Sequence, residues 1–321
     1  MYQDVLEETR ESELDTASQY LHIYKREIVA RNYDRSFIRA FRQIEFEKLI
    51  PHILTAHCDN GWKQLKIFEG GVGTGLFTIP IIKHILQRDG ESFLVGNDNS
   101  MAMLDVLLDK PEFQALQNQG DGRISIGYGD LEAIEHYPPT GDFNVLVFAG
   151  VFHCLSEGHA FLKQIDRILV KNGILIMVFK TDAFTRLQCG EPFSYSSLDS
   201  HYGNFWRYYH HLRSFYHTPI ERRCRFIYDV PLVNKLIQLQ YNNRYVLQKI
   251  HEFTWSSTTP MEKMICAIEH GLTFATGQGV SPEMLRKLGQ EMKDWLSSNH
   301  LEQKEVEIDH KMELVVWKKT E

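Results

Sequence analysis

Short apolar runs alternate with helix-spaced apolar residues through the first half of the chain. The runs with the length of buried strands cover residues 65–68, 92–96, 123–128, 143–148 and 174–179. Apolar residues with a helical period fill 76–86, a stretch that opens at Ser100, and 161–170. This order predicts a parallel sheet with helices on both faces, joined by right-handed crossovers.

The flanking regions follow different patterns. Before the first strand, helical spacing over residues 12–30 and 38–50 predicts two helices. Asn32-Tyr33-Asp34 should break them apart, with Asp34 as the N-cap of the second helix. Aromatic and histidine side chains crowd residues 183–225 without strand alternation, so we expect a helical insertion there. Further helices are expected over 227–239, 260–271 and 281–297, and strands over 245–255 and 305–318.

A glycine-rich run, Glu69-Gly70-Gly71-Val72-Gly73-Thr74-Gly75, joins the first strand to the next helix. Glycine permits positive φ and close approach of a ligand, and the helix directs its free N–H groups at the turn. Leu76 follows Gly75, so the Lys-Ser/Thr of a P-loop is missing, and the spacing is not the G-x-G-x-x-G of nicotinamide enzymes. The turn predicts a ligand site, with a βα turn that binds nothing as the alternative.

Two acids end the strands that follow. Asp98 ends the second strand, 23 residues after Gly75, where a carboxylate can accept the ribose hydroxyls of an adenosine ligand or merely cap the next helix. Asp130, within Gly129-Asp130-Leu131, ends the third strand, and its alternative role is that of a turn former. Because open α/β sheets bind ligands outside the carboxyl ends of their strands, these groups favour one shared site.

These motifs together resemble those of the class I S-adenosylmethionine (SAM) methyltransferases. The run at 69–75 resembles the first motif of that family, and residues 98–104 are similar to its D-x-S-x-x-M-L. Residues 167–173 match its R-x-L-K-P-G-G turn only in part, since Asn172 replaces Pro-Gly. The resemblance implies an α/β, Rossmann-like, doubly wound seven-stranded sheet with an antiparallel last strand at one edge. N-terminal helices and a helical cap inserted after strand five would complete the fold.

The resemblance also implies SAM as the cofactor. The glycine turn and the small residues after the fourth strand would hold its methionine part, Asp98 its ribose and Asp130 its adenine amino group. Glu69 would repel a pyrophosphate but can hold the ammonium group of SAM, directly or through water. The expected cofactor-binding residues are Glu69, Gly71, Gly73, Gly75, Asp98, Asn99, Met103, Asp130, Leu131, Phe148 and Ala149.

Methyl transfer depends mainly on aligning the acceptor and excluding water, with a base where the acceptor is an amine or hydroxyl. His153, at a position where many relatives carry His, and Tyr33, which resembles a tyrosine that closes over SAM in relatives, are the expected catalytic residues. A structural role is the alternative for each. An aromatic cover suits an apolar, aromatic or cationic acceptor, unless these rings form the core of a small cap or a dimer contact. The expected acceptor-binding residues are Tyr202, Trp206, Tyr209 and His210.

Composition and charge limit the kinds of partner that we expect for this chain. The net charge of −7 leaves no overall basic field for nucleic acid. No apolar stretch has the roughly 18 residues of a membrane-spanning helix, and residues 1–13 lack the apolar core of a signal peptide. Five widely spaced cysteines without a C-x-x-C pair predict free thiols in a reducing cytoplasm, and no metal-binding motif occurs.

We therefore expect a cytoplasmic SAM-dependent methyltransferase that acts on a nitrogen or oxygen of a small-molecule acceptor. Such an enzyme could act in secondary metabolism, and the chain could form a homodimer. The expected domains are an N-terminal helical lid (1–58), a SAM-binding core (59–182 with 245–321) and an aromatic-rich substrate cap (183–244). An NAD(P)-dependent oxidoreductase and a non-catalytic SAM-binding protein stay open as alternatives.

Overall fold

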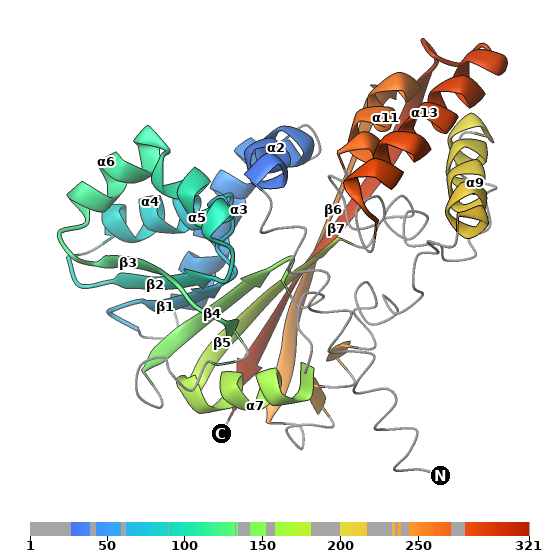
Figure 1. The fold of residues 1–321 in the computed structure, drawn as a ribbon. Coiled ribbons are helices and arrows are strands. Elements are labelled where there is room, and N and C mark those ends of the chain that lie inside the picture. Colours follow the sequence, from blue (N-terminus) through green and yellow to red (C-terminus); the bar gives the residue numbers. More distant parts are fainter. Residues whose placement is uncertain are drawn as a thin grey trace.

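The computed structural model describes residues 27–38, 43–58, 62–88, 90–131, 133, 142–151, 158–180, 200–216, 233–234, 237–238, 244–270 and 280–320. Within these residues, seven strands form one sheet flanked by helices (Figure 1). The strands are β1 (Lys66–Gly70), β2 (Phe93–Asp98), β3 (Ile124–Tyr128), β4 (Phe143–Ala149), β5 (Leu169–Lys180), β6 (Tyr245–Pro260) and β7 (Glu305–Lys319). Their order across the sheet is β3-β2-β1-β4-β5-β7-β6.

The strand order places the ligand-binding edge. β1 pairs in parallel with both β2 and β4, and the chain progresses outward to β3 on one side and to β5 on the other. Open α/β sheets bind ligands beyond the carboxyl ends of strands at such a reversal. The expected Rossmann-like α/β sheet is confirmed, and its strand order predicts a ligand site beyond the ends of β1 and β4.

The last strand is antiparallel, as expected, but its expected place at one edge is wrong. β7 pairs in antiparallel register with both β5 and β6, so β6 forms the edge. Burial explains the difference: Leu314 to Trp317 are buried in succession, as in an interior strand. Along β6, exposed residues alternate with partly buried ones over most of its length, which suits an edge.

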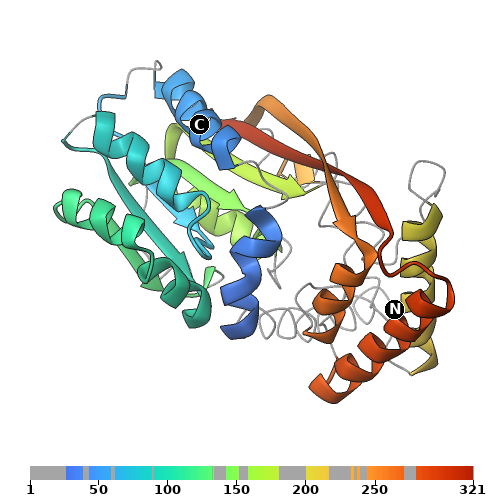
Figure 2. The same cartoon turned by 90° about the horizontal axis from the view of Figure 1, so that it is seen from above.

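Helices cover both faces of the sheet. On one face, α3 (Gln43–Cys58), α4 (Thr78–Arg88), α5 (Met101–Leu108) and α6 (Pro111–Gln119) share an apolar core with the strands. α7 (Gly158–Ile168) packs on the opposite face (Figure 1). α2 (Glu27–Ile38) lies between α5 and α11 (Met261–Glu269) in both views (Figures 1 and 2).

Several local predictions hold and several fail. Ser100 and Ser281 are N-caps: their hydroxyls accept from the N–H of Met103 and of Met284, each at 3.2 Å. The expected break at Asn32-Tyr33-Asp34 is wrong, because α2 runs through it unbroken. α6 was not predicted, and α7 ends at Ile168, two residues before its predicted end. The helix expected over 227–239 lies largely outside the described residues.

A second apolar core lies at the far end of the β6–β7 ribbon. Only residues 312–318 of β7 pair with β5, so the ribbon continues beyond the sheet as two strands. There α9 (Ser200–Phe215), α11 and α13 (Pro282–Ser298) pack together against Val306 and Ile308 (Figure 1). We call these three helices the distal helical layer. It joins the middle of the chain to its last quarter.

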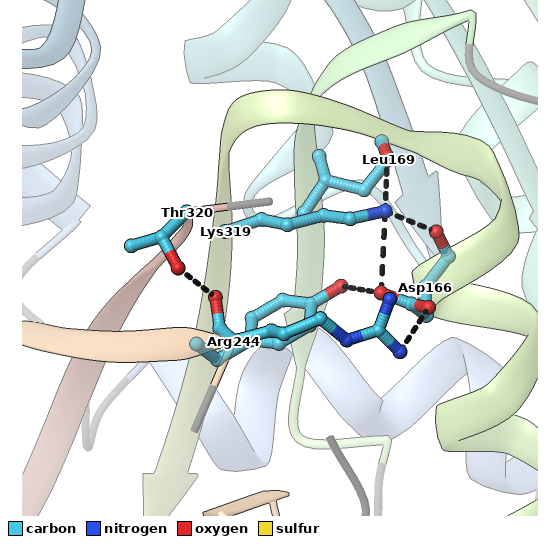
Figure 3. Close-up of polar contacts among 6 residues, drawn as sticks. Asp166, Leu169, Arg244, Lys319 and Thr320 are labelled. Atoms are coloured by element: carbon cyan, nitrogen blue, oxygen red, sulfur yellow. Dashed lines mark hydrogen bonds and ion pairs between the residues drawn. The ribbon is translucent and has the colours of Figure 1, made fainter. Parts of the chain in front are cut away.

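A polar cluster fastens the opposite end of the ribbon to α7 (Figure 3). The ammonium of Lys319 donates to the backbone oxygens of Asp166 and Leu169 at 2.5 and 2.8 Å, and lies 3.2 Å from the Asp166 carboxylate. Arg244 pairs with that carboxylate at 3.0 Å, and the Tyr245 hydroxyl donates to it at 3.3 Å. We call Asp166, Arg244, Tyr245 and Lys319 the amino-edge cluster, since β5 begins there. Among the residues that the structure describes, no helix is long and apolar enough to cross a membrane.

Candidate functional site

The glycine turn begins where β1 ends. Gly71, Gly73 and Gly75 all have positive φ, at 72°, 53° and 88°. At Gly75 an added Cβ would also lie 2.3 Å from Cδ1 of Leu107, so both conformation and space require glycine there. The N–H groups of Gly71 and Val72 donate to the backbone oxygen of Asn97 at 2.8 and 3.0 Å. The turn is therefore held against the end of β2.

Glu69 is the most unusual group at this edge. Its side chain is 1% exposed, and its Oε2 has no hydrogen-bond partner among the described residues. Burial raises the pKa of Glu69 from 4.5 to about 8, opposed by the nearby Thr78 hydroxyl and reinforced by the negative Asp98. A buried carboxylate oxygen that lacks a partner is suited to receive a cationic ligand group.

Asp98 lies at the end of β2, as predicted, and already binds the backbone. Its Oδ2 accepts from the N–H of Gly73 at 2.8 Å, and its Oδ1 accepts from the N–H of Ser100 at 2.9 Å. Burial raises the pKa of Asp98, against the effect of these backbone donors. The N–H of Asn99 donates to the Asp98 carboxylate as well. A carboxylate offers about four lone-pair sites, so these donors leave it some capacity for a further donor such as a hydroxyl group.

The remaining strand ends close the same edge. The N–H of Gly129 donates to the backbone oxygen of Asp98 at 3.0 Å, and Asn97 Nδ2 donates to Gly129 O at 3.2 Å. Asp130 is exposed just beyond β3, whereas Leu131 is buried. A Cβ at Gly70 would lie 2.6 Å from Leu131 and 2.4 Å from the ring of Phe148. The predicted residues of β1 to β4 are thus brought together at one edge.

Other predicted site residues lie elsewhere or outside the described part. Met103 is buried against α2, with Val29, Ala30 and the partly buried Tyr33. Ala149 and Asn99 are partly exposed at the ends of β4 and β2. His153 lies outside the described residues. The predicted roles of all these side chains in binding or catalysis stay predictions.

The aromatic residues expected to bind the acceptor lie in the distal helical layer. Tyr202, Trp206 and Tyr209 are at most 2% exposed and share its apolar core, while His210 is partly exposed. Trp206 packs edge-on against Tyr209 at 5.5 Å between ring centroids. Burial raises the pKa of Tyr209 to about 12, opposed by Arg213. Their surroundings are those of core residues, and their role toward the acceptor stays a prediction.

Two polar groupings were missed by the sequence reading. Asp34 contacts Thr74 of the glycine turn and Lys110, although these residues are far apart in the chain. On the ribbon, Ser257 Oγ and His310 Nε2 lie 2.7 Å apart, and the His310 ring stacks on Trp255 at 5.2 Å between centroids. No local pattern marks either grouping, because each is assembled by strand pairing or helix packing. In the described ranges, no three His, Cys, Asp or Glu residues gather as metal ligands would.

Comparison with known proteins agrees with this geometry. Residues 68–177, about a third of the chain, match the family model of a methyltransferase domain. Together with the strand order and the glycine turn, this match identifies residues 68–177 as a class I SAM-dependent methyltransferase domain, as the sequence predicted. No curated protein matches the chain.

Solved structures offer distant likenesses. A protein from Bacillus halodurans C-125 assigned as a methyltransferase is 13% identical, with a TM-score of 0.47, over 84% of this chain and 99% of that chain. A protein from Galdieria sulphuraria assigned as a sarcosine dimethylglycine methyltransferase is 10% identical, with a TM-score of 0.46, over 95% and 98%. Haemonchus contortus phosphoethanolamine N-methyltransferase 2, solved with phosphomonomethylethanolamine and S-adenosylhomocysteine, is 13% identical, with a TM-score of 0.42, over 84% and 52%. Likeness this low bears on no substrate of this chain.

Proposed function

We propose that the chain binds SAM at the carboxyl edge of β1 to β4 and transfers its methyl group to a nitrogen or oxygen of a small-molecule acceptor. The observation that carries the proposal is Glu69, a buried carboxyl group beside the glycine turn whose Oε2 has no partner among the described residues. SAM carries an ammonium group, and a cation at this position would satisfy that oxygen. A phosphate group would offer that oxygen no positive charge.

In this proposal, different residues of the chain bind different parts of the cofactor. Glu69 holds the ammonium, directly or through water, and the positive-φ turn lets the methionine part approach the backbone. Asp98 accepts the ribose hydroxyls with its remaining lone pairs, while Asp130 and Leu131 receive the adenine. Bound SAM supplies an activated methyl group, so the chain mainly has to align the acceptor and exclude water.

A small acceptor fits the charge of the chain better than a polyanion does, because the net charge is −7. An amine or hydroxyl acceptor loses a proton during transfer, and His153 and Tyr33 are proposed to assist at that step. The cytoplasmic location and a homodimer stay predictions.

The direct test is calorimetric titration with S-adenosylhomocysteine (SAH). The wild-type chain should bind it, and Asp98→Ala should weaken binding about 100-fold through lost charged hydrogen bonds. Asp105→Ala removes an exposed carboxylate from α5, the helix that follows Asp98, and should leave the affinity unchanged. Equal affinities in wild type and Asp98→Ala would remove Asp98 from the ribose site.

Two further measurements separate the alternatives. Binding of a nicotinamide dinucleotide without SAH binding would select an oxidoreductase. For the acceptor, SAH release from SAM should be followed across a panel of amines, phenols and alcohols. SAH binding with no turnover on any of them would favour a non-catalytic SAM-binding protein.

A further inference from the structure

We propose that Asp34, Thr74 and Lys110 form a clamp that holds α2 on the glycine turn, and that Asp34 is thereby a positioning residue for the cofactor. The three residues come from separate segments. Asp34 belongs to α2, Thr74 to the turn, and Lys110 to the junction between α5 and α6. The inference rests on the proposed function, because it concerns how that same site is held in shape.

The contacts of the clamp form a closed triangle. The hydroxyl of Thr74 donates to Oδ1 of Asp34. The ammonium of Lys110 lies 2.5 Å from Oδ2 of Asp34 and donates to the backbone oxygen of Thr74 at 2.6 Å. Each member therefore contacts both others, and two of the contacts fall on the residue between Gly73 and Gly75. Such a network fixes the position of the turn more tightly than a single hydrogen bond would.

The Asp34–Lys110 ion pair is less exposed to solvent than the Arg31–Glu27 pair on the same helix. The side chains of Lys110 and Asp34 are 24% and 17% exposed, and Thr74 is 1% exposed as a residue. The pair Arg31–Glu27, also on α2, is 71% and 70% exposed. Opposite charges interact more strongly where solvent screens them less, whereas exposed pairs contribute little. The Arg31–Glu27 pair is therefore a matched control.

The described apolar contact beneath α2 is made with α5. Val29 and Ala30 of α2 are buried with Met103, and the partly buried Tyr33, Ala102 and Val106 pack against them. The clamp adds polar contacts to this apolar one. The same contact places α2 next to α5, which begins directly after Asp98 and Ser100.

The clamp connects α2 to the proposed cofactor residues through one peptide bond. Thr74 follows Gly73, whose N–H donates to Oδ2 of Asp98 at 2.8 Å. When Asp34 and Lys110 hold Thr74, they also hold the N–H that orients Asp98. Since coupling between two events is reciprocal, a ligand that requires this turn geometry should in return stabilise docked α2.

Two measurements on the full chain test the clamp, with SAH as the probe. The first is SAH affinity by calorimetry. Asp34→Ala and Lys110→Met should each weaken SAH binding about 10-fold. The double variant should also lose only about 10-fold in affinity, because both changes break one network. Glu27→Gln should bind like the wild type.

The second measurement is hydrogen–deuterium exchange over residues 27–38. SAH should slow exchange there in the wild type and in Glu27→Gln, and it should have no such effect in Asp34→Ala. Without ligand, Asp34→Ala should already exchange faster than the wild type in α2 but not in β4 or α13, which reports local undocking rather than global unfolding.

The outcomes separate the clamp from the proposed function. If the wild type binds SAH and Asp34→Ala binds it equally well, with unchanged exchange in α2, the clamp is overturned and the cofactor assignment stands. Additive losses in the double variant would also overturn it, since they would show two independent effects. If the wild type does not bind SAH, the cofactor assignment fails, and unchanged exchange in ligand-free Asp34→Ala would reject the clamp as well.

Discussion

The acids at the two ends of the sheet have opposite surroundings. At the carboxyl edge, Glu69 is buried with Oε2 unpartnered in the described part of the chain, and its pKa is raised to about 8. At the amino edge, Asp166 receives Lys319, Arg244 and Tyr245 within 3.3 Å (Figure 3). Both acids lie in the same fold beside the same sheet, so the difference lies in what surrounds each carboxylate.

Asp166 therefore stabilises the fold, whereas Glu69 is suited to bind a ligand. A paired acid contributes to stability through its donors. A buried acid with an oxygen that lacks a donor lowers the stability of the folded state, and such groups cluster at functional sites. The carboxylate of Asp166 thus has several donors at the amino edge, whereas an oxygen of Glu69 has none among the described residues at the carboxyl edge.

The largest effect should follow from neutralising Glu69. The folded-state pKa of about 8 lies above the ordinary value of 4.5, so the destabilisation is absent below pH 4.5, grows as pH rises and is complete above pH 8. Glu69→Gln should therefore raise the free energy of unfolding by roughly 4 kcal/mol at pH 9 and by little at pH 5. Urea denaturation at both pH values measures this. In the exposed control Glu305→Gln, the change in unfolding free energy should be the same at both pH values. The same lack of pH dependence in Glu69→Gln would contradict the raised pKa of Glu69.

A smaller effect, of opposite sign, should follow at the amino edge. Lys319→Met removes the donor of two backbone oxygens and one partner of Asp166, so we expect a loss of about 2 kcal/mol in unfolding free energy. Affinity for SAH should not change, because the amino-edge cluster lies at the other end of the strands. Lys318→Met, one residue away, should stay within about 0.5 kcal/mol of the wild type. A large loss of SAH affinity in Lys319→Met would show that the amino-edge cluster also affects ligand binding, which would contradict the separate roles of the two edges.

The smallest effect is the pH dependence of cofactor binding. If Glu69 ionises when it receives the ammonium of SAH, binding releases a proton below pH 8, and affinity should rise at most tenfold per unit between pH 6 and 7.5. Titrations in buffers with different ionisation enthalpies would measure the proton released per SAH bound. Glu69→Gln should bind SAH without this release, and release that persists in the variant would assign the proton to another group.

The local part of the site could be predicted from sequence because its requirements are local. Positive φ at Gly71, Gly73 and Gly75 follows from a tight turn between a strand and a helix. The cap formed by Ser100 follows from its hydroxyl and its place before an apolar helix. Asp98 and Asp130 were placed correctly at strand ends because apolar runs mark where buried strands stop.

Other features depend on which distant segments meet. The sequence suggested a break at Asp34, since a short polar residue often caps a helix. In the fold, α2 continues, and Asp34 instead contacts a lysine and a threonine brought to it by α5 and β1. The aromatic residues of 200–215 were expected to cover an acceptor, and in the structure Tyr202 and Trp206 pack with α11 and α13. Composition alone does not distinguish a core ring from a ligand-facing ring.

By itself, the sequence determined the alternating α/β order and the glycine turn, because periodicity and turn chemistry act between near neighbours in the chain. The methyltransferase class was implied by the resemblance of its motifs to that family. Only the tertiary structure decided that β7 lies inside the sheet, that α2 is fastened to the turn, and that Glu69 and Asp166 differ in their partners. Pairing register, burial and pKa depend on residues that are distant in the chain and adjacent only after folding.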